Sequence, residues 1–175
     1  MTFPFPNSDK MVVRRIPHES LKQTAEQMKI LAWEGQTSPL VRQFAIETLR
    51  RVKPKDMLSE VGALYHACCR EIHYLADPIG AEFLQHPEVT VRTAAGDCDD
   101  MAILLASTLL MSEILSVGYQ CRYKLVGLKG SPPSHVFLEV NIKGQWVALD
   151  PVAGSATKQM LKDITSEQIY NLSDP

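Results

Sequence analysis

The sequence lacks any long apolar run and any leader pattern at its beginning. Its most apolar stretch, Met101 to Met111, is shorter than the ~20 residues that a membrane-spanning helix needs. The first residues contain no basic region followed by an apolar run, so no secretory signal peptide is expected. We therefore expect no membrane partner and take the reducing cytoplasm as the default location.

Basic stretches and paired cysteines are also missing. Lys and Arg number 18 against 20 Asp and Glu, with a formal net charge of -2 and no Lys/Arg block, so nucleic acid is not an expected partner. The cysteines form no CxxC pair and no Cys/His spacing typical of zinc; they are Cys68, Cys69, Cys98 and Cys121. We accordingly expect no metal and no cofactor.

What is present is an ordinary globular composition. The chain has 175 residues, 45% hydrophobic and 22% charged, which suits one domain with its own core. Residues 1–17 hold three prolines and no sustained period, so we expect an extended arm in which Val12-Val13 could add an edge strand. Residues 18–175 are expected to form the single domain. Its parts are a helical part (18–75), a central part with the functional candidates (76–152) and a C-terminal tail (153–175).

One-sided apolar stripes predict three amphipathic helices in the helical part. The first ends at Gly35, and the second begins at Ser38-Pro39, an N-cap and first helical residue, and stops at Pro54. Asp56 caps the third, whose stripe consists of Val61, Leu64, Tyr65, Cys68, Ile72 and Leu75. We interpret these stripes as core faces rather than as partner sites.

The stretch between the third helix and Gly96 carries weaker signals. Turn-forming residues over 74–80, including Asp77-Pro78, end the helix. Residues 81–85 are expected to form a short helical turn that Pro87 closes, and residues 88–93 an extended run.

The stretch Gly96-Asp97-Cys98-Asp99-Asp100 opens a helix that is apolar on nearly every side and is therefore buried. Asp97 suits its N-cap and Asp100 completes a capping-box-like pattern, and we expect the helix to end near Val117-Gly118. Capping is preferred to a metal cluster of Asp97, Asp99 and Asp100, because successive helix residues do not converge on one ion. Cys98 lies in the first turn, where backbone N–H groups can activate a thiol, provided that a partner base is present. Alternatively, Cys98 is a small packing residue, and this stretch alone leaves both interpretations open.

After Gly118 the period changes from helix to strand. Residues 121–128, 134–142 and 145–150 alternate as strands, with Lys143-Gly144 as a hairpin turn between the last two. In the tail we expect a short helix at residues 158–161 and a turn near residues 167–170. Helices followed by an antiparallel sheet make an α+β fold.

The hairpin allows a geometric inference about one histidine and one aspartate. If Lys143-Gly144 are the two central turn residues, Ile142 faces Gln145 and Phe137 faces Asp150. His135 then shares a face with Asp150, at a diagonal backbone distance of about 7–8 Å that the two side chains can bridge. A three-residue loop would put them on opposite faces. The alternatives without a functional role are that His135 is a half-exposed polar residue and that Asp150 only ends the strand before Pro151.

Three segments resemble the transglutaminase-like superfamily. They are Gly96-Asp97-Cys98-Asp99-Asp100, Ser134-His135-Val136-Phe137-Leu138-Glu139-Val140, and Gly144-Gln145-Trp146-Val147-Ala148-Leu149-Asp150-Pro151. Upstream Tyr74, Asp77-Pro78, Glu82 and Pro87 look like the short bacterial and bacteriophage members. The resemblance covers residues 20–152. It implies a papain-like arrangement, with the nucleophile at the start of a core helix that packs on an antiparallel sheet.

The resemblance implies a Cys98-His135-Asp150 triad of nucleophile, general base and orienting carboxylate, acting through a thioester acyl-enzyme. The substrate would be an amide of a peptide or protein. Hydrolysis is preferred to transfer to an amine, because the chain has no room for the extra β domains and calcium sites of animal transglutaminases. Tyr74 and Gln85 are candidates for the oxyanion side-chain donor, and Trp146 for substrate binding.

Two rival functions belong to other classes. The first is a non-catalytic scaffold or bacteriophage virion-associated protein that keeps the fold as a binding surface. Its location would then be the virion rather than the bacterial host cytosol. The second is a helical interaction module built from residues 18–75.

Overall fold

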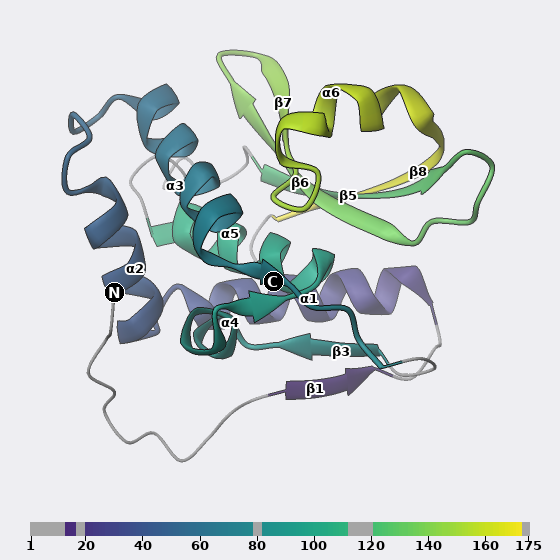
Figure 1. Cartoon of the computed structure of the whole chain (residues 1–175), viewed down its shortest axis with the longest axis horizontal. Coiled ribbons are helices and arrows are strands. Elements are labelled where there is room, and N and C mark those ends of the chain that lie inside the picture. Colours follow the sequence, from purple (N-terminus) through teal and green to yellow (C-terminus); the bar gives the residue numbers. More distant parts are fainter. Residues whose placement is uncertain (1–12, 17–19, 79–81, 112–120, 173–175) are drawn as a thin grey trace.

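The computed structural model describes residues 13–16, 20–78, 82–111 and 121–172. Within them, four helices surround a central helix that packs on a four-stranded antiparallel sheet, and the predicted α+β class is confirmed. The helices and the turns of 3-10 helix are α1 (Leu21–Gly35), α2 (Pro39–Leu49), α3 (Met57–Glu71), α4 (Pro87–Thr93), α5 (Cys98–Met111), η1 (Gly154–Ala156), α6 (Thr157–Met160) and η2 (Leu161–Asp163). In Figure 1 the sheet lies at the upper right, and α5 lies in the middle of the molecule between the sheet and α1.

The strands form one main sheet and two short ribbons. Their bounds are β1 (Val13–Ile16), β2 (His73–Tyr74), β3 (Glu82–Gln85), β4 (Ala95–Gly96), β5 (Cys121–Leu128), β6 (His135–Ile142), β7 (Gln145–Leu149) and β8 (Ile164–Asn171). The main sheet has the order β7-β6-β5-β8, β1 pairs antiparallel with β3, and β2 pairs parallel with β4.

The three predicted helices of the first part are present, but the second and the third are shorter than expected. α2 ends at Leu49, before the predicted stop at Pro54. Ser20 Oγ accepts a hydrogen bond from Gln23 N at the start of α1, and Asp56 caps α3. The prediction that α3 continues to Leu75 is wrong, because the backbone turns extended at Ile72. The N–H of Leu75 then bonds to the carbonyl of Gly96, 2.9 Å away. The parallel pairing of β2 with β4, which lies just before Cys98, thus takes the place of the expected last turn of α3.

In the stretch before Gly96 the predicted helix and strand are interchanged. Residues 82–85 form a strand rather than a helical turn, and residues 87–93 form a helix rather than an extended run. Pro87 does not close a helix but begins one, as its fixed φ and missing N–H allow at the first helical position. β3 is a strand because it pairs with β1, with Val13 opposite Gln85, and that partner is distant in sequence. The expected edge strand at Val12-Val13 is thus present from Val13 onward, and Val12 lies outside the described residues.

The core helix α5 is buried along nearly its whole length. Met101 N bonds to the carbonyl of Asp97, so the helix starts where the sequence predicts. The carboxylate of Asp100 accepts a hydrogen bond from Asp97 N at 3.3 Å, which is the backward half of the expected capping box. The predicted end near Val117-Gly118 lies outside the described residues.

In the part of the chain that the structure describes, no helix combines the length and apolarity needed to cross a bilayer.

The β6–β7 hairpin has the predicted register. Ile142 pairs with Gln145, and Lys143 and Gly144 both have positive φ, as a two-residue turn of this twist requires. The predicted tail helix is present as α6. The turn expected at residues 167–170 is wrong, because this stretch belongs to β8, which pairs with β5. Its residues are mostly polar and exposed, so partner pairing rather than an apolar period makes it a strand.

The main sheet is buried on both faces around β6. Val136, Leu138 and Val140 belong to the hydrophobic core that α5 crosses. On the opposite face Phe137 is fully buried, and the buried Glu139 forms ion pairs with Arg122 and Lys124. The face of β6 that carries His135 is therefore covered rather than exposed to solvent, and this agrees with the prediction from the sequence.

Candidate active site

His135 and Asp150 meet across the hairpin. His135 begins β6 and Asp150 follows the last residue of β7, and His135 Nε2 lies 2.7 Å from Asp150 Oδ2. The Asp150 side chain is fully buried, whereas 16% of the His135 side chain is exposed. The diagonal contact inferred from the spacing is confirmed.

The Asp150 carboxylate is held from both sides. Its Oδ1 accepts hydrogen bonds from the backbone N–H groups of Val152 and Ala153, each at 3.0 Å. Its Oδ2 faces His135. A buried carboxylate with donors on both oxygens cannot rotate freely, so it fixes the orientation of the imidazole ring.

The contact also determines which ring nitrogen is available for chemistry. Because Nε2 of His135 faces a carboxylate, this nitrogen carries a proton and donates it to the hydrogen bond. The neutral ring then has its lone pair on Nδ1. A base of this form can accept a proton at Nδ1 while Asp150 stabilises the resulting positive charge.

Cys98 lies at the start of the buried helix that packs on β6. It is the first residue of α5, is partly buried and forms no disulfide. The first-turn N–H groups of a helix have no partners within the helix, so they can stabilise negative charge nearby. The structure thus places the thiol at a helix N-terminus, as predicted from the sequence.

Tyr74 lies next to the Cys98 turn. It pairs with Gly96 in the β2–β4 ribbon. Its pKa is raised, first by desolvation and then by the negative charges of Cys98 and Asp97. The phenol therefore keeps its proton and can donate a hydrogen bond, although 57% of the residue is exposed. Of the two predicted side-chain donors, Tyr74 has the hydroxyl that is free to turn toward a substrate.

Gln85 is engaged elsewhere. Its backbone N and its Nε2 donate to the two carboxylate oxygens of Asp100, at 2.8 and 2.7 Å. Burial raises the pKa of Asp100 to about 7, against the lowering effect of the Gln85 N–H. The Gln85 side chain thus ties β3 to the first turn of α5. Its role as an oxyanion donor stays a prediction.

Three carboxylates gather at the same turn. Oxygens of Asp97, Asp99 and Asp100 lie within 4.8 Å of one another, so the expectation that neighbouring residues of a helix start do not converge is wrong. They form the one group among the described residues whose geometry could hold a metal, and oxygen ligands suit a hard cation such as Ca²⁺. The Asp100 carboxylate nevertheless already accepts hydrogen bonds from Gln85 and Asp97. The geometry thus shows directly that Asp100 links Gln85 of β3 to the first turn of α5 by hydrogen bonds.

Trp146 is not brought to the histidine–aspartate pair. It lies opposite Asn141, six residues along β6 from His135, or about 20 Å by the rise of a strand. The guanidinium of Arg122 stacks on its ring, 3.8 Å from the centroid. This contact assigns Trp146 a packing partner on the sheet, and its role in substrate binding stays a prediction.

Tyr65 contacts the turn that follows Asp150, which sequence reasoning missed. We assigned it to the apolar stripe of α3, but its hydroxyl lies 3.2 Å from the carbonyl oxygen of Asp150 and 3.1 Å from that of Gly154. Desolvation raises the pKa of Tyr65 to about 12, so it remains a donor. No local signal could have revealed the contact, because 85 residues separate Tyr65 from Asp150.

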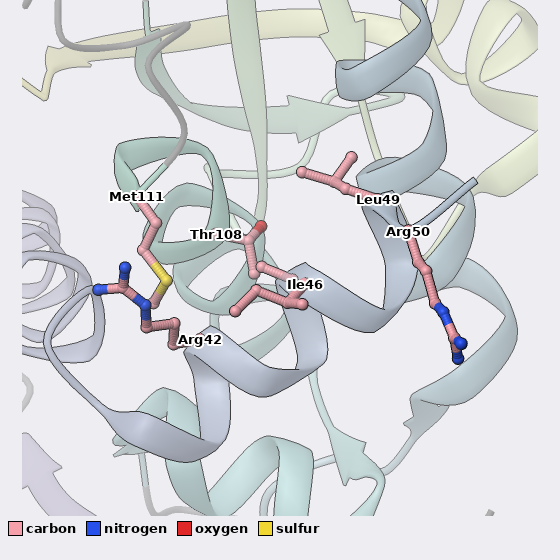
Figure 2. A pocket seen from close by; sticks show the side chains of 7 residues that line it. Arg42, Ile46, Leu49, Arg50, Thr108 and Met111 are labelled. Carbon is pink, nitrogen blue, oxygen red and sulfur yellow. The ribbon is translucent and has the colours of Figure 1, made fainter. Parts of the chain in front are cut away.

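A cavity of about 280 Å³ lies away from this site, between α2 and the end of α5. Figure 2 shows Thr108, Met111, Ile46 and Leu49 around it, with Arg42 beside Met111. Thr108 is ten residues from Cys98, about 15 Å along the helix. The cavity is therefore separate from the Cys98 turn.

Solved structures with the same fold include three from bacteria. Calcium-bound LapG of Legionella pneumophila has a TM-score of 0.56 and 18% identity, over 83% of this chain and 86% of that one. A candidate cysteine protease of Cytophaga hutchinsonii has a TM-score of 0.50 and 18% identity, over 90% of this chain and 49% of that one. A candidate protease of Parabacteroides distasonis has a TM-score of 0.53 and 11% identity, over 85% and 29% of the two chains. This chain thus spans only about half of the Cytophaga protein, and at these identities the likeness concerns the fold alone.

The sequence comparisons give the family. No curated protein matches the chain. The family model of the transglutaminase-like superfamily matches residues 43–151, which is more than half of the sequence and includes Cys98, His135 and Asp150. The chain belongs to the transglutaminase-like superfamily.

Proposed function

We propose that the protein is a cysteine-dependent amide hydrolase or acyl-transferase that uses Cys98, His135 and Asp150 as a catalytic triad. One observation carries the proposal. The imidazole of His135 is held 2.7 Å from a fully buried carboxylate, at the start of the strand on which the Cys98 helix packs. A carboxylate in this position fixes the tautomer and the orientation of the ring and stabilises the imidazolium, as in other triads with a histidine base.

In the proposed reaction, Nδ1 of His135 takes the proton of the Cys98 thiol. Asp150 at Nε2 stabilises the imidazolium that results, and the N-terminus of α5 stabilises the thiolate. The Cys98 sulfur then attacks the amide carbonyl carbon and forms a C–S bond. The carbonyl oxygen takes up the negative charge.

The tetrahedral intermediate collapses when the C–N bond breaks. The leaving amine takes the proton from His135, and a thioester on Cys98 remains. Water then loses a proton to His135 and attacks the thioester, the C–S bond breaks, and a carboxylic acid leaves. An amine in the place of water would give transfer instead of hydrolysis.

The oxyanion needs donors that are already in place. We assign one to the backbone N–H of Cys98, in the first turn of α5, and one to the hydroxyl of Tyr74. Gln85 is the weaker choice, because its amide group already donates to Asp100.

A peptide or protein is the proposed substrate class. Two of the similar structures are named as proteases, which supports hydrolysis over transfer, and their likeness to this chain is one of fold. Assays of peptide cleavage should be run with Ca²⁺ and with EGTA, since LapG structures were obtained both calcium-bound and EGTA-treated.

The test is the rate at which iodoacetamide alkylates Cys98 as a function of pH, in the wild type and in His135→Ala. We expect fast alkylation well below pH 7 in the wild type. In the variant, fast alkylation should begin only near pH 8.5, the ordinary pKa of a free thiol. Cys69 is an internal control, because burial raises the pKa of its thiol. Cys98 and Cys121 fall in one tryptic peptide, because no Lys or Arg lies between them. Fragment ions must therefore show which of the two cysteines is alkylated.

If Cys98 is slow at all pH values below 8, or equally fast without His135, the triad proposal is refuted. The fold would then serve as a binding surface, as in the scaffold alternative.

A further inference from the structure

We propose that Tyr65 is a positioning residue of the active site: its hydroxyl holds the Asp150–Gly154 turn, and through this turn it fixes the Asp150 carboxylate against His135. The inference rests on the triad proposed above, and it adds a fourth residue from a different layer of the fold.

The first step of the argument is that the turn orients the carboxylate. Both contacts of Asp150 Oδ1 come from the backbone N–H groups of Val152 and Ala153, two and three residues further on. If the backbone of the turn shifts, these donors move with it, and the carboxylate loses the support that aims Oδ2 at His135.

The second step is that the turn needs support from outside. Gly154 N closes the turn on the carbonyl of Asp150, at 2.9 Å. Gly154 itself has φ +51, and apart from its two chain neighbours no residue has an atom within 4 Å of where a Cβ would lie, so nothing packs on that side of its backbone. The local hydrogen bonds of the turn, including that from Thr157 Oγ1 to Gly154 O, come from the same short segment and move with it.

Tyr65 supplies the support from another part of the chain. Its hydroxyl lies within hydrogen-bond distance of the carbonyl oxygens at both ends of the turn, Asp150 O and Gly154 O, and can donate to either of them. The residue belongs to α3, which packs against α5. The bond therefore ties the turn of Asp150 to the helical layer that also carries Cys98.

Tyr65 is also a dependable donor. Its pKa of about 12, raised chiefly by desolvation, keeps the phenol protonated over the whole range in which a thiol and an imidazole titrate. An effect of its removal on the pH profile of Cys98 therefore does not come from the titration of Tyr65 itself.

The experiment is the pH profile of Cys98 alkylation in the wild type, Tyr65→Phe, Asp150→Ala and the double variant. Tyr65→Phe keeps the ring and removes the hydroxyl. We expect the midpoint of the profile to rise by about half a pH unit, which corresponds to a roughly threefold lower rate on the acid side and lies within the worth of one net hydrogen bond. In the Asp150→Ala background the same change should have no effect, because the group on which Tyr65 acts is gone.

Tyr170→Phe is the matched control. Tyr170 lies on β8, and its hydroxyl bonds to Gln168 Oε1 at 2.6 Å, so the change removes one tyrosine hydroxyl away from the Asp150 turn. Its profile should equal that of the wild type.

The outcomes separate the two proposals. A wild-type profile with no reactive Cys98 below pH 7 refutes the triad. A normal wild-type profile that Tyr65→Phe leaves unchanged refutes the positioning role alone. An effect of Tyr65→Phe that persists in Asp150→Ala, or that Tyr170→Phe reproduces, also refutes it, because Tyr65 would then act through general stability.

Discussion

Replacing Asp150 by Asn tests the geometry of the site with almost no change of shape. In the native site Oδ1 accepts two backbone N–H groups and Oδ2 faces His135 Nε2. An Asn side chain has one oxygen and one NH₂ group. The oxygen must stay with the two backbone donors, so the NH₂ group faces the imidazole and donates to Nε2.

This reversal puts the imidazole proton on the wrong nitrogen. With Nε2 accepting, the neutral ring carries its proton on Nδ1 and has no lone pair there for the Cys98 proton. The variant also loses a charge-assisted hydrogen bond to the imidazolium, worth about 1.5–3 kcal/mol, or roughly 10- to 150-fold in the population of the reactive pair.

The assay is the alkylation rate of Cys98 at pH 6, read from peptide masses. We expect Asp150→Asn to be slower by at least about tenfold, with a near-native circular dichroism spectrum. Asp163→Asn is the matched control, because the Asp163 carboxylate pairs with Lys129 at 3.7 Å, outside the site. A rate in Asp150→Asn equal to that in the wild type would refute the argument, since the buried carboxylate would then not determine the state of the imidazole.

Three further predictions follow from the same structure. Tyr74→Phe should lower kcat on a cleaved peptide by about 10²-fold and leave the alkylation rate of Cys98 unchanged, if the phenol stabilises the oxyanion; an unchanged kcat would leave the backbone N–H as the donor. Leu104→Ala, at a fully buried position of α5, should lower the free energy of unfolding in urea by about 2–5 kcal/mol with little change in m, and a loss below about 1 kcal/mol would contradict the burial. The pKa of Asp100 rises from 3.8 to about 7 on folding, so the folded protein binds the extra proton and should lose stability as the pH rises through this range. Between pH 5 and pH 8 in EGTA, the wild type should therefore lose a few kcal/mol relative to Asp100→Asn, and parallel stability curves would show that Asp100 does not titrate in this range.

The parts of the structure that the sequence predicts correctly depend on local signals. Lys143-Gly144 allows a two-residue turn, the turn sets the register of the hairpin, and the register brings His135 to Asp150. The start of α5 follows from the carboxylates around Cys98 and the apolar run behind them.

The errors share a different cause. β3 and β8 are strands because distant partners, β1 and β5, supply their hydrogen bonds, and no apolar period marks them. Pro87 can end or begin a helix, and only the fold determines which. Tyr65 looks like any half-buried helix residue until the turn after Asp150 folds back onto it.

Acylation of Cys98 by an activated ester tests the central claim most directly, because p-nitrophenyl acetate does not depend on the identity of the natural substrate. The account predicts a burst of nitrophenol at pH 6.5, equal to the protein concentration, with the acetyl group on Cys98 and a slower steady state after it. His135→Ala should show no burst. An absent burst in the wild type, or an equal burst without His135, would contradict the account, because Cys98 would then not be a nucleophile activated by His135 and Asp150.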